Sequence, residues 1–252
     1  MRVALLCLAL VPLFDRQCSR SAAEGPDAAA AVQSAAPERN EEGPIRIEAL
    51  EQPNEPPVYV LRGGPRGPEK IVFLHGMCGH GQGYAEAFQR TAARRGTLIA
   101  PQADVPCGNG PWARWSKDLD ALDARIVRAF RALGAAEPIE DVIVIGYSQG
   151  ATRAESLART FPERYTRLVL MGGPYAAKAQ GLEKLRGAVA LAGDRDRLDL
   201  MQASAKVLKG ARVPATFMLI PEATHGSMGA HPEQTMDEVF TWLAEHQRPI
   251  AP

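Results

Sequence analysis

Short runs of apolar and often β-branched residues recur along the chain from residue 58 onward, and each has the length of one strand. These runs cover residues 58–61, 71–74, 98–100, 142–145, 168–171, 188–192 and 216–220. A continuous apolar run such as 142–145 is typical of a strand that is covered on both faces. The pattern therefore predicts a set of strands that are mostly buried at the centre of a sheet.

Stretches with helical periodicity separate most of these runs. In residues 112–133 the apolar side chains at 119, 122, 126, 130 and 133 fall on one face of a helix. The expected helices cover residues 84–94, 112–133, 151–159, 198–208 and 234–245. Alternating strands and helices predict an α/β protein with a mostly parallel central sheet and helices on both faces. In such sheets the chemistry lies in the loops at the carboxyl ends of the strands.

The N-terminal residues do not follow this pattern. Arg2 precedes an almost entirely apolar stretch over residues 3–14, which matches a secretory signal peptide with cleavage after Ala23. A buried N-terminal helix is the alternative, and Pro12 disfavours it. The sequence therefore predicts a signal peptide over residues 1–23 and a secreted or periplasmic protein.

The segment that follows has a composition unlike that of a folded domain. Residues 24–55 are rich in Ala, Pro and Glu and contain few large apolar side chains. Such a segment buries too little apolar surface to offset the cost of ordering it, so it predicts a flexible linker. The remaining residues, 56–252, are expected to form one domain.

Composition and charge narrow the possible functions. The chain has 252 residues, of which 46% are hydrophobic and 23% charged, as in ordinary globular proteins. Its formal net charge is zero, and it becomes about −2 once the predicted signal peptide is removed. This balance argues against nucleic acid as a partner. No apolar run reaches the 18 or so residues that a transmembrane segment needs.

A serine motif follows the apolar run at residues 142–145. Gly146-Tyr147-Ser148-Gln149-Gly150 lies between this predicted strand and the next predicted helix. The Gly-x-Ser-x-Gly pattern in that position is typical of a nucleophile elbow, in which a tight turn holds the serine hydroxyl above the sheet edge. The alternative is an incidental serine in a glycine-rich turn. Ser148 is therefore the candidate nucleophile.

A serine nucleophile needs a base, and the base needs an acid to orient it. With this turn, the acid and then the histidine are expected later in the chain. The strand at 188–192 is followed by Asp194 and Asp196, and the strand at 216–220 is followed by a loop that contains His225. His225 is therefore the candidate base, and both aspartates are candidate acids.

These residues resemble the α/β-hydrolase superfamily, in particular its small lidless serine esterases of the phospholipase/carboxylesterase and dienelactone-hydrolase-like branches. The resemblance covers about residues 58–244. It implies Asp196 as the acid, three residues after the glycine that ends the strand, with Asp194 as the second choice. It also implies an oxyanion hole formed by the backbone N–H groups of Met77 and Gln149. Many relatives carry a lid between strands 168–171 and 188–192, but this interval is too short here for a lid domain.

The resemblance also makes the strands before Cys78 and Cys107 neighbours, which implies a disulfide between these cysteines in an oxidising compartment. Two separate thiols are the alternative. Trp112, Trp115 and Tyr147 are candidates for a substrate pocket, although the two tryptophans fit equally well as packing residues of a helix.

The resulting hypothesis is a serine hydrolase that cleaves small carboxylic esters through Ser148, His225 and Asp196 and an acyl-enzyme. No cofactor is expected, and no Cys/His pairs have the spacing of a metal site. Peptidase, thioesterase or acyltransferase activity on the same scaffold, or a non-catalytic binding module, are the alternatives.

Overall fold

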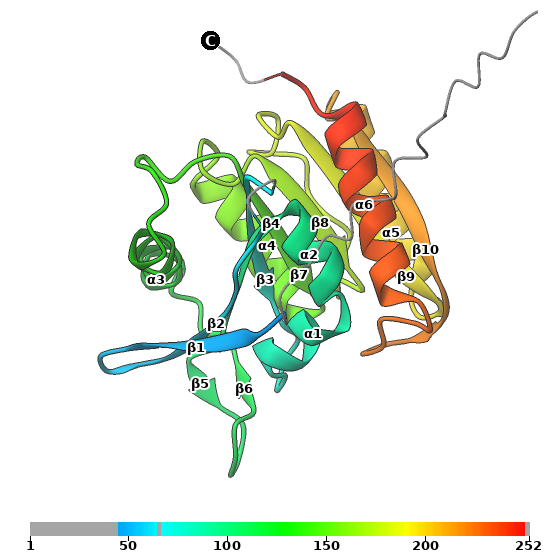
Figure 1. Cartoon of the computed structure of the whole chain (residues 1–252). Coiled ribbons are helices and arrows are strands. Elements are labelled where there is room, and N and C mark those ends of the chain that lie inside the picture. The colour runs from blue at the N-terminus through cyan, green and yellow to red at the C-terminus, as the bar shows by residue number, and fades with distance from the viewer. Residues whose placement is uncertain (1–44, 65–66, 250–252) are drawn as a thin grey trace, which may run out of the picture. The chain divides into compact units, whose positions relative to one another are not determined.

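The computed structural model describes residues 45–64 and 67–249, and its centre is one eight-stranded sheet (Figure 1). The strand order is β1-β2-β4-β3-β7-β8-β9-β10. The pairs β1–β2 and β2–β4 are antiparallel, and all the other pairs are parallel. The strands are β1 (Ile47–Gln52), β2 (Glu55–Leu61), β3 (Glu69–Leu74), β4 (Gly96–Pro101), β7 (Val142–Tyr147), β8 (Arg167–Met171), β9 (Gly187–Arg195) and β10 (Ala215–Thr224). All the strands predicted from the apolar runs are confirmed.

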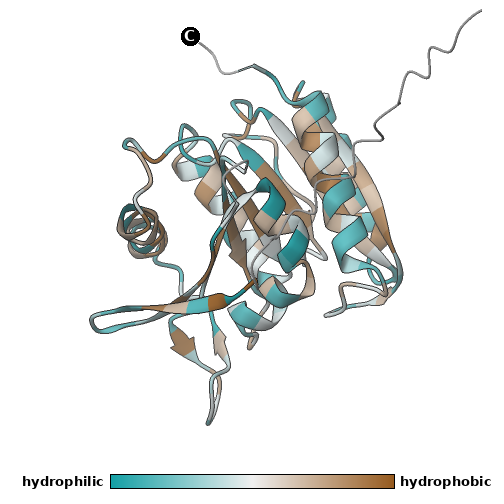
Figure 2. Ribbon diagram, viewed as in Figure 1, coloured by the Kyte–Doolittle hydropathy of each residue, from teal (hydrophilic) through white to brown (hydrophobic). Residues whose placement is uncertain are grey.

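Helices cover both faces of this sheet, as the sequence predicts (Figure 1). On one face lie α1 (Gly81–Ala87), α2 (Gln89–Arg95) and α6 (Pro232–His246), and on the other lie α3 (Leu119–Ala132), α4 (Gln149–Thr160) and α5 (Leu198–Gly210). Strand β7 shows why both faces need cover. Val142 and Val144 belong to one core cluster, whereas Ile143 and Ile145 belong to the other. The central strands are accordingly the most hydrophobic part of the ribbon (Figure 2).

Two expectations about local structure are wrong. The helix expected at 112–133 begins only at Leu119, because the Asp118 side chain caps it by accepting a hydrogen bond from the Ala121 N–H at 2.9 Å. The residues before it form a small ribbon of β5 (Val105–Pro106) and β6 (Ala113–Arg114). The helix expected at 84–94 is divided into α1 and α2 at Phe88, whose backbone leaves the helical region.

The boundary of the expected linker is also corrected. Strand β1 lies inside residues 24–55, so the folded part begins before residue 56. This strand forms one edge of the sheet and none of its residues is buried, and for that reason its sequence lacks the apolar run of a buried strand. The predicted signal peptide and residues 24–44 lie outside the described residues.

The region where a lid would be expected is short. Residues 172–186, between β8 and β9, contain no helix, which agrees with the prediction that there is no lid domain. Within the described residues, no helix combines the length and the hydropathy needed to cross a bilayer.

Candidate active site

The turn at Ser148 is as tight as the serine motif predicts. Strand β7 ends at Tyr147 and helix α4 begins at Gln149, so Ser148 is the single residue between them. Its φ of 51° lies in a region that non-glycine residues rarely adopt. A Cβ at Gly146 would lie 2.2 Å from the Gly150 carbonyl oxygen, and a Cβ at Gly150 would lie 2.0 Å from the Leu74 carbonyl oxygen. Both glycines are therefore required for steric reasons.

The structure brings Ser148, His225 and Asp196 into one hydrogen-bonded chain. His225 Nε2 lies 3.0 Å from Ser148 Oγ, and His225 Nδ1 lies 2.9 Å from Asp196 Oδ2. Because an ionised carboxylate only accepts, Nδ1 carries the proton toward Asp196 and Nε2 is free to accept from the serine hydroxyl. The Asp196 side chain is nearly buried, at 8% exposure, whereas that of His225 is 53% exposed.

Asp194, the other candidate acid, is placed differently. Its Oδ2 accepts a hydrogen bond from the Glu222 N–H at 3.0 Å, near the end of β10 and three residues before His225. Asp196 Oδ1 accepts from the Arg197 N–H at 2.7 Å, which leaves Oδ2 for the histidine. Of the two aspartates, the one within hydrogen-bonding distance of His225 is thus Asp196.

The candidate oxyanion donors are held in position through their neighbours. The Gly76 carbonyl accepts hydrogen bonds from His75 Nδ1 at 2.7 Å and from the Gly79 N–H at 3.1 Å. Because the peptide unit is planar and trans, this fixes the Met77 N–H in the opposite direction. Among the hydrogen bonds of the described residues, neither the Met77 N–H nor the Gln149 N–H donates to a protein acceptor. Both are therefore available to a ligand oxygen.

His75 and Trp115 connect the two segments that carry these donors. Burial lowers the pKa of His75 to about 4, so the ring is neutral, and its Nε2 accepts from the Ala103 N–H at 3.1 Å. Trp115 Nε1 donates to the His75 carbonyl at 2.7 Å, while the Trp115 backbone N–H donates to Gln149 Oε1 at 3.0 Å. Trp115 thus contacts both segments at once.

A disulfide between Cys78 and Cys107 lies beside Met77, with an S–S distance of 2.08 Å. It joins the loop after β3 to the loop after β4, and these two strands are parallel neighbours. The Cys107 N–H also donates to the Trp112 carbonyl at 2.8 Å, which continues the connection into β6. The loop of the candidate oxyanion hole is therefore covalently anchored.

Of the three aromatic residues expected to line a pocket, the structure exposes only Trp112, at 50%. Trp115 and Tyr147 are each 3% exposed and hydrogen-bonded inside the protein, which for Trp115 favours the packing alternative. Gly172 was not anticipated from the sequence. It has a φ of +52°, which favours glycine, and a Cβ there would crowd the acid at 3.0 Å from Asp196 Oδ2. A Gly-Gly pair directly after a buried strand was the available signal.

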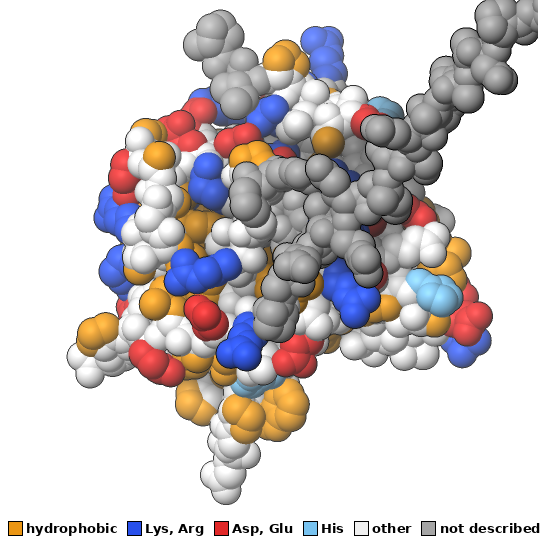
Figure 3. Space-filling model, in the orientation of Figure 1, with side chains coloured by type: hydrophobic (Ala, Val, Ile, Leu, Met, Phe, Trp, Pro, Cys, Tyr) orange, Lys and Arg blue, Asp and Glu red, His pale blue; other side chains and the backbone are white. Residues whose placement is uncertain are grey.

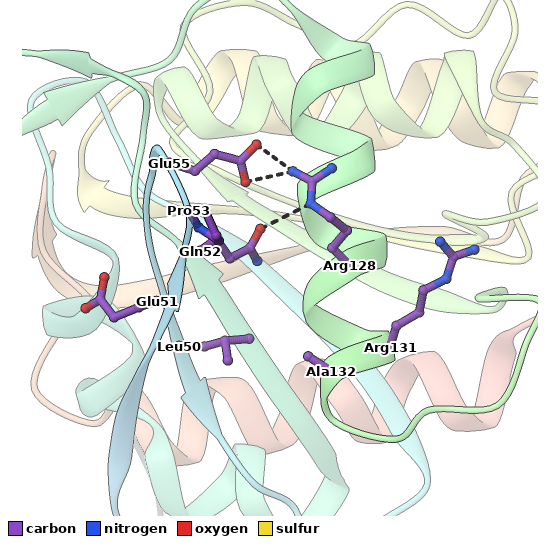
Figure 4. A pocket seen from close by; sticks show the side chains of 8 residues that line it. All are labelled: Leu50, Glu51, Gln52, Pro53, Glu55, Arg128, Arg131 and Ala132. Carbon is purple, nitrogen blue, oxygen red and sulfur yellow. Dashed lines mark hydrogen bonds and ion pairs between the residues drawn. The ribbon is translucent and has the colours of Figure 1, made fainter.

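A cavity lies away from these residues. It has a volume of about 430 Å³ and lies between the β1–β2 hairpin and α3 (Figure 4). The Arg128 guanidinium closes one side of it with hydrogen bonds to both Glu55 carboxylate oxygens, at 2.5 and 2.7 Å. None of the three hydrogen-bonded residues Ser148, His225 and Asp196 lines this cavity. Within the described residues, no group of three or more His, Cys, Asp or Glu side chains is arranged to hold a metal ion.

Comparison with known proteins agrees with this fold. Residues 70–233 match the family described as "alpha/beta hydrolase fold", and the chain belongs to that family. It is 29% identical over 156 residues to Lipase LipV of Mycobacterium tuberculosis, a match that covers 61% of this chain and 55% of the relative. The chain thus spans about half the length of that lipase.

Solved structures show the same fold at low sequence identity. The serine hydrolase FphF of Staphylococcus aureus, which binds fluorophosphonates, has a TM-score of 0.60 and 15% identity, over 80% of this chain and 99% of its own. Naproxen esterase of Bacillus subtilis has a TM-score of 0.57 and 13% identity, over 79% and 92%. A bacterial membrane phospholipase A has a TM-score of 0.58 and 16% identity, over 80% and 86%.

Proposed function

We propose that the protein is a serine hydrolase that cleaves carboxylic esters, with Ser148 as nucleophile, His225 as base and Asp196 as the orienting acid. The observation that carries this proposal is the hydrogen-bonded chain from Ser148 Oγ through His225 to Asp196, with distances of 3.0 and 2.9 Å. It lies on a strand-to-helix turn whose two glycines admit no side chain.

The reaction follows from this geometry. Ser148 Oγ attacks the ester carbonyl carbon while His225 Nε2 takes the hydroxyl proton, and Asp196 stabilises the imidazolium. The oxygen of the tetrahedral intermediate accepts hydrogen bonds from the Met77 and Gln149 N–H groups. When the intermediate collapses, the alcohol leaves with the proton from His225. Water, activated by the same histidine, then releases the acid and restores the serine.

Exposed apolar side chains at the carboxyl edge of the sheet favour substrates with an apolar part. Met77 is 61% exposed, Trp112 50% and Tyr175 75%, and all three lie in loops at this edge. Contact between such side chains and an apolar part of a ligand removes apolar surface from water and so favours binding. The lipase and the esterase among the relatives support an ester as the bond cleaved.

We propose further that the protein is secreted or periplasmic, with a signal peptide over residues 1–23 and a linker that ends before β1. The disulfide supports an oxidising compartment. Mass spectrometry of the protein recovered from the medium or periplasm of an expressing bacterium tests this. The proposal expects a chain that begins at Glu24 and lacks two hydrogens relative to the reduced formula. An intact N-terminus at Met1 would contradict it.

The proposed activity is tested with a fluorophosphonate probe and with p-nitrophenyl esters of increasing chain length. Wild-type protein should be labelled once and should hydrolyse the esters, whereas Ser148→Ala should do neither. Ser156→Ala is the matched control, because its hydroxyl lies on the same helix and donates only to the Thr152 carbonyl. If wild type is neither labelled nor active, or if Ser148→Ala behaves like wild type, the protein is not a serine hydrolase. Matched thioester and amide substrates separate the alternative activities.

A further inference from the structure

The candidate base lies on a loop with little protein around it. The His225 side chain is 53% exposed, and Thr224 and Gly226 on either side are exposed as well. Gly226 has a φ of +93°, in the region that favours glycine. Exposed loops of this kind move easily unless hydrogen bonds hold them. The 3.0 Å contact between His225 Nε2 and Ser148 Oγ therefore needs support from outside the loop.

Two tyrosines from the body of the domain bind the residue next to His225. The Gly226 N–H donates to the Tyr147 hydroxyl oxygen, and the Tyr84 hydroxyl donates to the Gly226 carbonyl at 3.4 Å. Both backbone polar groups of Gly226 are thus bonded to side chains that come from distant elements, β7 and α1. No other residue of the loop has this pair of side-chain contacts within the described part of the chain.

Stacked aromatic rings connect the two tyrosines to the core. The ring of Phe73, which is fully buried, stacks on Tyr84 with centroids 5.3 Å apart, and Tyr84 stacks on Tyr147 at 5.3 Å. Tyr147 in turn contacts the imidazole of His225, with centroids 5.5 Å apart and planes inclined by 48°. The column therefore runs from the buried strand β3 to the candidate base.

The chemistry of Tyr147 is consistent with a holding role. Its side chain is buried beneath the loop. Burial raises the pKa of Tyr147 to about 12, so the phenol keeps its proton at the pH values where a histidine acts as a base. Tyr147 thus does not give up its proton during the reaction, and its oxygen serves as the acceptor for the Gly226 N–H.

We propose that Tyr147 and Tyr84 are positioning residues for the base, which hold Gly226 at both of its polar groups and so keep His225 Nε2 directed at Ser148. This inference rests on the proposed serine-hydrolase function. A misplacement of about 1 Å in a catalytic group reduces rates on the order of 100-fold. Tyr147 makes the shorter contact and also touches the imidazole, so its hydroxyl is expected to have the larger effect.

The test removes single oxygen atoms. Tyr147→Phe should lower kcat about 10- to 100-fold with KM nearly unchanged, and should slow fluorophosphonate labelling of Ser148 by a similar factor. Tyr84→Phe should lower kcat by a smaller factor of about three to ten. Tyr59→Phe is the matched control, because its hydroxyl bonds His80, which is outside the hydrogen-bonded chain, and this variant should retain wild-type kcat.

Two measurements separate positioning from a general loss of structure. In Tyr147→Phe, hydrogen exchange should accelerate in the peptide that contains Gly226 and not in the core strands. This measurement does not depend on catalytic activity, so it tests the contact even if the protein hydrolyses no ester. In a His225→Ala background, Tyr147→Phe should leave the residual labelling rate unchanged, because the tyrosine acts through the histidine.

The outcomes distinguish the two proposals. Equal kcat in Tyr147→Phe and wild type, or the same loss of labelling with and without His225, would overturn the inference and leave the hydrolase proposal intact. Failure of wild type to be labelled or to hydrolyse esters would instead refute the proposed function. Unchanged exchange at Gly226 in Tyr147→Phe would refute the positioning contact by itself.

Discussion

The two aspartates at the carboxyl end of β9 give the sharpest test of the proposed chemistry. Asp196 and Asp194 stand two residues apart, yet only Asp196 reaches His225, at 2.9 Å from Nδ1. In Asp196→Asn, the amide oxygen should keep the hydrogen bond from the Arg197 N–H, so that the amide NH₂ faces the imidazole. Nδ1 must then accept, and the ring proton moves to Nε2, where it faces Ser148 and blocks its deprotonation.

The expected loss is large because a histidine in this tautomer cannot act as the base. A change of this kind lowers kcat on the order of 10⁴-fold, or about 5.5 kcal/mol of activation free energy. Asp194→Asn is the matched control, because an amide oxygen still accepts from the Glu222 N–H, and it should stay within a few-fold of wild type.

The assay is hydrolysis of a p-nitrophenyl ester under saturating substrate, with the midpoint of thermal unfolding measured for both variants. The reasoning is refuted if Asp194→Asn loses as much activity as Asp196→Asn at equal thermal stability. It is refuted equally if Asp196→Asn retains wild-type kcat.

Three further predictions concern the surroundings of Ser148. Because the folded protein keeps His75 neutral down to about pH 4, whereas the unfolded chain protonates near pH 6.5, the free energy of unfolding should fall as pH drops between these values and level off below. Chemical denaturation across this range tests the loss, which should reach at most about 3 kcal/mol and shrink in His75→Gln. Replacing Cys78 and Cys107 together by alanine should lower the free energy of unfolding by about 3–4 kcal/mol in denaturant titrations, because the cross-link no longer restricts the unfolded chain; unchanged stability would contradict this. Trp112→Ala should lower kcat/KM for octanoate esters more than for acetate esters, and an equal effect on both would argue against a contact with the acyl chain.

The sequence predicts the central strands well because a strand that is buried on both faces requires a continuous apolar run, as at residues 142–145. It also predicts the position of Ser148, since the glycines at 146 and 150 reflect a steric demand of the turn itself. The apolar pattern does not predict strand β1, because an edge strand with no buried residue needs no such run. The pattern predicts too early a start for α3, because Trp112 is apolar but lies in the segment before the helix.

Sequence patterns do not predict the side-chain contacts around His225. Asp194 is near the last residue of β9 and Asp196 directly follows the strand, and only the direction in which the chain leaves β9 decides which of the two meets the histidine. Likewise, Tyr147 is the second residue of the serine motif, but its sequence neighbours do not predict a contact with Gly226, which is 79 residues away. Such contacts depend on tertiary geometry.

The order of the strands means that the proposed hydrolysis would depend on the pairing of the whole C-terminal half of the sheet. Ser148 follows β7 and His225 follows β10, and β8 and β9 lie between these strands. Three inter-strand spacings amount to roughly 14 Å. A slip in the pairing of either intervening strand would carry the two residues out of reach, even in a chain that keeps its overall secondary structure. During refolding, recovered turnover should therefore lag behind circular dichroism and mark the moment when strand pairing is complete.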